Sequence, residues 1–208
     1  MQYFRTHFLP PTLTNGEWSP LLHIEGVGNS LDFYRALADY VLNLRTPQGP
    51  VLDIGCATGR LMGELLARIE TPAYGLDVNA ASLVHAYEYL PKATARLARA
   101  DATSLPIATE SVDVALLINL LDRVHNPEIV LAECGRVTHQ GGLLVVASTH
   151  DWAHSPEPAL ADRIPDYLRR AGFRRESPAT DLVWMLPDAM NSRHVHVYRV
   201  EVEAFVRS

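Results

Sequence analysis

The sequence predicts an α/β fold, a doubly wound and mostly parallel sheet of seven strands whose last strand is antiparallel. Three observations lead to this fold class. From Pro50 onward, short apolar runs alternate with helical patterns, which is the order of βα units in a parallel sheet. A glycine-containing turn at residues 55–59 follows the first of these runs directly. Residues 193–205 alternate apolar and polar side chains, as an antiparallel strand does.

The predicted elements follow from hydrophobic periodicity and from turn and capping residues. Residues 30–45 carry an apolar stripe at helical spacing, with Ser30 as the N-cap. Asn126 and Pro127 are typical of the start of a helix, and residues 139–142, His-Gln-Gly-Gly, are typical of a turn. The strands are expected at residues 51–55, 73–78, 95–100, 112–121, 142–148, 181–186 and 193–205, and the other helices at 60–69, 79–90, 126–137 and 158–173.

Length and composition indicate one globular domain. The 208 residues are 48% hydrophobic and 20% charged, which suits a packed core. We expect a single domain over residues 1–208, with the core of the fold at 30–208. The net charge of -6 argues against a nucleic-acid partner, which would require a clustered basic surface. Two cysteines, Cys56 and Cys134, lack the spacing of a metal site, so no metal is expected.

The N-terminal residues and the apolar runs bear on location. The first eleven residues lack the apolar segment of a signal peptide, and every apolar run is far shorter than the ~20 residues that span a bilayer. With only two cysteines, a reducing compartment is favoured. We therefore expect a cytoplasmic protein without a membrane partner.

The strongest local signal is the segment Asp53-Ile54-Gly55-Cys56-Ala57-Thr58-Gly59, between a strand and a helix. Glycine permits a positive φ and lets a ligand approach the backbone, while the helix that follows presents free N–H groups to an anionic group. The alternative is that Gly55 and Gly59 only make a tight turn. Three further polar positions favour a ligand site.

The first position lies at the end of the second predicted strand, the next directly after the third, and the last within the fourth. The Asp77 carboxylate can accept hydrogen bonds from two ribose hydroxyls, and Asp101, followed by Ala102, can accept one from an adenine amino group. Asn119 places a polar side chain in an apolar strand, where it needs a partner. Each residue alone could be a cap or turn residue, but together they trace one elongated ligand across neighbouring strand ends.

The segments DIGCATG, GLDVN, RADATSLPIATESVDVALLINLL and GGLLVVAS resemble the successive motifs of class I S-adenosylmethionine-dependent methyltransferases, over about residues 50–148. This resemblance implies a Rossmann-like fold and S-adenosylmethionine as the cofactor, with Ala57 in place of the commoner middle glycine. It also implies roles for individual residues: the two glycines border the methionine part, Asp77 holds the ribose, Asp101 and Ala102 flank the adenine, and Asn119 lies near the methionine end. The expected cofactor-binding residues are Asp53, Gly55, Cys56, Ala57, Gly59, Arg60, Asp77, Val78, Asp101, Ala102, Asn119 and Leu120.

Two other classes of function remain open. A nicotinamide-dependent oxidoreductase also has a glycine-rich turn followed by an acid about 20 residues later. However, a GxGxxG pattern that starts at Gly55 meets Ala57 and Arg60 in place of glycines. A protein that binds the cofactor without catalysis is the third class, and only an activity assay separates it.

Candidates for binding and activating the methyl acceptor lie beyond the fourth and fifth predicted strands. One loop carries Asp122, Arg123 and His125, and the other carries His150 and Trp152. We take Asp122 and His150 as the candidate catalytic residues, because a carboxylate or an imidazole can hold an acceptor or remove its proton. The alternative is that Asp122 and Arg123 form a solvated ion pair.

Residues 119–152 are similar, more narrowly, to the methyltransferase domain of ovothiol-synthesising enzymes, which resembles NLxDRLYDP, then GGLLVIAS, then an aromatic-containing loop. That family methylates an imidazole nitrogen of a thiol-bearing histidine. His125 stands where the family has tyrosine, and the Trp-Leu-Gly-Gly segment after Trp152 is missing. The resemblance implies a small-molecule or short-peptide acceptor with a reactive ring nitrogen, and O-methylation of a carboxylate is the alternative.

The first 29 residues are rich in proline and in aromatic side chains. We expect this segment to fold over the open end of the sheet as a lid that excludes water. Its aromatic residues could equally cover the helix predicted at 30–45. The side chains expected to reach the acceptor are Tyr3, Phe4, Trp18 and His23.

Overall fold

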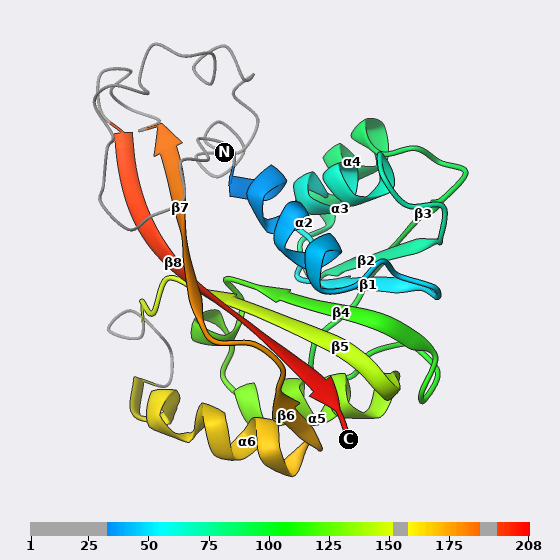
Figure 1. Ribbon diagram of the computed structural model, residues 1–208. Helices are drawn as coiled ribbons and strands as arrows, with labels where there is room; N and C mark the ends of the chain where they lie inside the picture. Colours follow the sequence, from blue (N-terminus) through cyan, green and yellow to red (C-terminus); the bar gives the residue numbers. More distant parts are fainter. Residues whose placement is uncertain (1–32, 152–157, 188–194) are drawn as a thin grey trace.

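The computed structural model of the protein describes residues 33–151, 158–187 and 195–208 (Figure 1). The lid segment and the Ser30 cap lie outside these residues. The helices are α2 (Phe33–Leu44), α3 (Arg60–Leu66), α4 (Ala80–Tyr89), α5 (Pro127–Val137) and α6 (Ile164–Arg170), with 3-10 turns η2 (Leu121–Arg123) and η4 (Pro158–Arg163). The strands are β1 (Val51–Ile54), β2 (Ala73–Asp77), β3 (Ala95–Arg99), β4 (Val112–Ile118), β5 (Thr138–Ser148), β6 (Phe173–Arg175), β7 (Thr180–Pro187) and β8 (Val195–Arg207). None of the described helices is long and apolar enough to cross a membrane.

The strands form one sheet in the order β3-β2-β1-β4-β5-β8-β6, with β7 also paired to β8. Strands β1 to β5 are parallel, and β8 is antiparallel to β5, β6 and β7. The chain leaves β1 for β2 and β3 on one side and returns to β4 on the other, so the sheet has a switch point between β1 and β4. The predicted fold class is confirmed. The sheet has eight strands instead of seven because the three residues of β6 also pair with β8.

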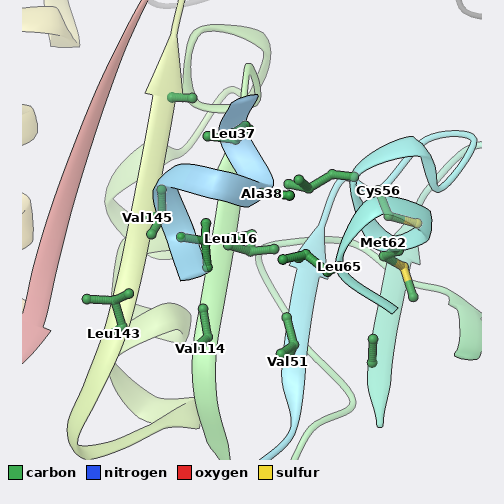
Figure 2. Packing of buried hydrophobic residues seen from close by; sticks show 14 of the residues in the cluster. Leu37, Ala38, Val51, Cys56, Met62, Leu65, Val114, Leu116, Leu143 and Val145 are labelled. Carbon is green, nitrogen blue, oxygen red and sulfur yellow. The ribbon is translucent and has the colours of Figure 1, made fainter. Parts of the chain in front are cut away.

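Alternation along the central strands divides the core between the two faces of the sheet. On β4, Val114 and Leu116 belong to one buried cluster, while Leu117 belongs to the other. Figure 2 shows Leu37 and Ala38 of α2 over the first face, close to Leu116. Helices α2, α3 and α4 lie on this side, and α5 and α6 lie on the opposite side (Figure 1).

The second face is closed by α5 and α6, which approach each other closely. Leu131 and Cys134 of α5 and Leu168 of α6 pack in the same buried cluster as Leu117. Gly135 faces the backbone carbonyl of Ala171 so closely that a Cβ would have no room. Both faces of the central strands β1 and β4 are therefore covered, as their continuous apolar sequences require.

The turn predicted at residues 139–142 is wrong, because these residues belong to β5. The pairing between β4 and β5 shifts register here, from Val112 opposite Thr138 to Val114 opposite Leu143. Extra residues on one strand of a ladder form a bulge, and Gly141 takes the required positive φ of 78°. Glycine and polar residues are common both in bulges and in loops, so residues 139–142 alone do not distinguish the two.

The single helix predicted at 158–173 is a 3-10 turn followed by α6. Pro165 lies in the first turn of α6. Proline has no N–H to donate and fixes its own φ, so it suits the first turn of a helix and breaks a helix interior. The α-helix therefore starts at Ile164 and not before it.

Strands β7 and β8 extend past the carboxyl end of β5. The pairing of β5 with β8 stops at Glu201, whereas β7 accompanies β8 onward to Val195. Figure 1 shows this pair of strands rising beyond the end of β5. The β7–β8 pair therefore forms a wall beside the carboxyl ends of the parallel strands.

Candidate active site

A cavity of about 500 Å³ opens at the carboxyl ends of the parallel strands, at the switch point between β1 and β4. Ligands of doubly wound sheets bind at such a crevice. The described residues that line it come from α2, the turn between β1 and α3, the ends of β2 and β4, the segment after β5, and the β7–β8 pair. They are Tyr34, Asp53, Gly55, Cys56, Ala57, Thr58, Arg60, Leu61, Asp77, Ile118, Asn119, Leu120, Arg123, Thr149, Asp151, Trp184, Leu186 and Tyr198.

The turn between β1 and α3 presents its backbone to this cavity. Gly55, Ala57 and Gly59 have positive φ angles of 76°, 47° and 73°. A Cβ on Gly59 would lie 2.7 Å from Leu90 Cδ1, so both the conformation and the packing favour glycine there. The predicted glycine-rich turn therefore exposes its backbone to the cavity, as a ligand-binding loop does.

Asp77 joins this turn to the end of β2. Its Oδ2 accepts a hydrogen bond of 2.8 Å from the Ala57 backbone N–H, and its Oδ1 accepts one of 2.8 Å from Asn79 N–H. A carboxylate offers about four lone-pair positions, so each oxygen can accept a further bond. Asp77 can therefore hold a ribose diol while it fixes the shape of the turn.

Asp53 and Cys56 are buried at the floor of the site. Burial, and secondly the negative charge of Asp77, raises the pKa of Asp53 to about 7. Burial, with the charges of both aspartates, also raises the pKa of the Cys56 thiol well above its usual value. The Cys56 side chain packs in the buried cluster and also lines the cavity, and its burial disfavours the thiolate form that a nucleophilic cysteine needs.

Two buried polar atoms on the cavity lining lack a hydrogen-bond partner within the described structure: Asn119 Oδ1 and Arg60 Nε. Asn119 directly follows β4 with a φ of 51°, and its N–H donates to Ala147 O at 2.8 Å. Buried polar atoms without partners commonly pair with a ligand. An amide oxygen suits the ammonium group of S-adenosylmethionine, and a guanidinium N–H suits its carboxylate, so the residues present fit this cofactor.

The other predicted cofactor residues lie at the rim or beyond it. Leu120 lines the cavity against Gly55, whereas Val78 is 57% exposed. Asp101 and Ala102 follow β3 and are not among the described lining residues. Hydrogen bonds from Thr103 N–H and Thr103 Oγ1–H to Asp101 lower the pKa of its carboxyl. The role of Asp101 and Ala102 beside the adenine stays a prediction.

The structure separates the acceptor candidates after β4. Arg123 lines the cavity, but Asp122 is 1% exposed and lies behind it, with no hydrogen-bond partner for either carboxylate oxygen among the described residues. Asp122 Oδ1 is 3.7 Å from Arg123 Nε. His125 is exposed and is not among the described lining residues. Asp122 is therefore placed to act through Arg123 and not by direct contact.

After β5, the cavity is lined by Thr149 and Asp151, which flank the predicted His150. His150 has a φ of 54°, and its Nε2 lies 3.1 Å from Glu201 Oε1. It is not among the described lining residues, and its part in catalysis stays a prediction. The remaining candidates for contact with the acceptor lie outside the described residues. They are Tyr3, Phe4, Trp18, His23 and Trp152.

Several lining residues were not predicted, above all Tyr34, Trp184, Leu186 and Tyr198. Trp184 and Leu186 alternate on β7, which places them on the same face of the strand. The sequence predicts a strand at residues 181–186 but does not indicate which of its faces is covered. Only the pairing of β7 with β8 and the contact with α2 show that this face meets the cavity.

Comparisons with known proteins find similarity to methyltransferases in sequence and in fold. Residues 52–146 match the family model described as a methyltransferase domain. The O-methyltransferase cnsE of Penicillium expansum is 30% identical over 142 residues, which cover 60% of this chain and 51% of that protein. The chain thus spans about half the length of the curated relatives it matches.

Two solved structures show the same fold. A geranyl diphosphate methyltransferase in complex with S-adenosylmethionine has a TM-score of 0.62 and 17% identity, covering 84% of this chain and 85% of that one. A Thermotoga maritima protein described as a possible histamine N-methyltransferase has a TM-score of 0.56 and 20% identity, covering 85% and 90%.

The family match covers the segment that carries the glycine-rich turn, Asp77 and Asn119. The two unpaired polar atoms, Asn119 Oδ1 and Arg60 Nε, belong to the same segment, which also supplies most of the described residues that line the cavity. Residues 52–146 are therefore similar to a methyltransferase domain, and the polar groups that line the cavity suit S-adenosylmethionine.

Proposed function

We propose that this protein transfers the methyl group of S-adenosylmethionine to a small molecule or a short peptide. The main support is that the cofactor turn and a second set of side chains line one continuous cavity. The bound cofactor supplies an activated methyl group, so the protein chiefly has to orient the acceptor and exclude water from it. The lining residues outside the cofactor turn are placed to do both.

A ring nitrogen, most simply that of an imidazole, is our first candidate for the methylated atom. The proposal rests on the similarity of residues 119–152 to the ovothiol-type domain, and the Thermotoga structure adds a relative in fold whose suggested substrate, histamine, carries an imidazole. A neutral imidazole already offers a lone pair at one nitrogen. Holding its other N–H in place would then matter more than removing a proton.

A carboxylate oxygen is the second candidate. It is favoured by the relative from Penicillium expansum, which is an O-methyltransferase, and by the presence of Arg123 on the cavity lining. A guanidinium can hold a carboxylate through two hydrogen bonds, and a carboxylate is already ionised near pH 7. No general base would be needed for that reaction.

The test is incubation of the protein with methyl-labelled S-adenosylmethionine and a panel of imidazole, amine, carboxylate and thiol acceptors. We expect label on a ring nitrogen, located by mass spectrometry and stable in mild alkali. A methyl ester, which mild alkali removes, would establish the second candidate instead. Binding of the cofactor without transfer to any acceptor would indicate a non-catalytic binding protein and would contradict the proposal.

His150 remains our candidate catalytic residue, whereas Asp122 is now a candidate positioning residue that acts through Arg123, and variants of both test these roles. We expect Asp122→Asn and His150→Ala each to lower kcat by about tenfold or more, with a nearly unchanged Kd for S-adenosylhomocysteine, because neither side chain lies at the cofactor turn. Single-turnover rates and calorimetry measure the two quantities. Glu176→Gln, at an exposed position beside Arg174, is the matched control. Variants with unchanged kcat would remove these residues from the mechanism.

A further inference from the structure

Three aromatic side chains from outside the cofactor turn form a wall of the cavity. It consists of Tyr34 on α2, Trp184 on β7 and Tyr198 on β8, all of which line the cavity. Trp184 and Tyr198 are directly opposite each other in the β7–β8 ladder, with ring centroids 5.5 Å apart and planes tilted by 41°. The two strands therefore present a pair of large rings to the same space.

Packing fixes this wall to the body of the protein. The buried ring of Phe33 lies 5.6 Å from the ring of Trp184 and 5.2 Å from that of Tyr34. Leu182 and Trp184, on the same face of β7, both pack against the buried cluster beneath α2. The wall is thus a preformed apolar surface, which orders a planar ligand at little cost in conformational entropy.

The charges near the wall are unfavourable for an anion. Arg123 Nη2 donates to Asp151 Oδ2 at 2.9 Å, and Arg123 Nε lies 3.7 Å from Asp122 Oδ1. Two carboxylates therefore share one guanidinium. A carboxylate ligand on Arg123 would therefore compete with Asp151 for this guanidinium and would meet the repulsion of both carboxylates.

The other guanidinium on the lining is also engaged. Arg60 lies over the ring of Tyr34, with Cζ 5.7 Å from the ring centroid, and its unpaired Nε suits the carboxylate of the cofactor. A cation placed against the rings of Trp184 and Tyr198 would gain cation–π attraction, and also attraction to the net negative charge that two carboxylates and one guanidinium leave on the lining. An anion at the same place would gain neither.

We infer that the aromatic wall is the acceptor subsite and that it takes a planar aromatic or heteroaromatic ring bearing a positively charged amine, in preference to an acid. The inference rests on the proposed function and narrows it to a class of acceptor. It also disfavours the carboxylate as the methylated group.

The test uses two probes with the same ring and opposite charge, histamine and imidazole-4-acetate. Each is titrated by calorimetry into protein saturated with S-adenosylhomocysteine. We expect histamine to bind at least about fivefold more tightly than imidazole-4-acetate. Imidazole-4-acetate bound as tightly as histamine, or no binding of either probe, would overturn the inference.

Substitutions in the aromatic wall test whether histamine binds there. Trp184→Leu and Tyr198→Leu should each weaken histamine binding about fivefold and leave the Kd for S-adenosylhomocysteine unchanged. Met185→Leu and Val197→Ala are matched controls, since adjacent residues of a strand point to the opposite face. Asp151→Asn should release Arg123 and strengthen binding of imidazole-4-acetate. Wild-type histamine affinity in Trp184→Leu and Tyr198→Leu would overturn the inference, whereas failure of S-adenosylhomocysteine itself to bind would contradict the proposed function.

Discussion

Replacement of Asp77 by alanine is expected to weaken the binding of S-adenosylhomocysteine by about thirtyfold or more. Two ribose hydroxyls would lose a charged acceptor, at ~1–3 kcal/mol for each bond, and a total of ~2 kcal/mol already corresponds to that factor. The loss also removes the acceptor for the Ala57 N–H, which helps to shape the turn. Calorimetric titration of the variant gives the dissociation constant directly.

A control for this experiment is Asp39→Ala, which removes an exposed carboxylate paired with Arg68 on the protein surface. It should leave the dissociation constant unchanged, since exposed ion pairs contribute little and Asp39 is not among the described lining residues. Thermal unfolding of both variants establishes that each is folded at the temperature of the titration. An unchanged affinity of folded Asp77→Ala would exclude Asp77 from the cofactor site.

The side of the cavity that carries the glycine-containing turn could be predicted from the sequence because its signals are local. The glycine turn, the acid at the end of β2 and the polar residue after β4 each follow an apolar strand, and parallel strands bring their carboxyl ends to one edge. Asp77 and Asn119 therefore meet the turn as a consequence of strand order alone. The start of α5 at Pro127 was predictable for the same reason, from a residue that suits the first turn of a helix.

The acceptor half depends on contacts between residues far apart in the sequence. Trp184 reaches the cavity only because β7 pairs with β8 past the end of β5 and then packs against α2. The burial of Asp122 likewise follows from the packing of η2 and α5, although its neighbours in sequence suggest a solvated ion pair. Local periodicity assigns a residue to a strand face, but it does not say which element covers that face.

The second large effect that we expect is a strong preference for S-adenosylhomocysteine over NAD⁺. The third glycine of a dinucleotide-binding turn allows the helix to approach the strand closely, and this chain has Arg60 there. Arg60 is the first residue of α3, and its Nε is buried at the cavity. Ala57 stands where the second glycine lets the backbone approach the pyrophosphate, and Arg60 stands where the third allows close packing of the helix, so we expect at least a hundredfold weaker binding of NAD⁺, about 3 kcal/mol.

The central claim is that the cavity at the carboxyl ends of β1 and β4 binds S-adenosylmethionine. One calorimetric experiment tests it most directly. The wild-type protein is titrated with S-adenosylhomocysteine and separately with NAD⁺ under the same conditions. We predict saturable binding of one S-adenosylhomocysteine per chain and no saturable heat with NAD⁺. Saturable binding of NAD⁺ with none of S-adenosylhomocysteine would contradict the account.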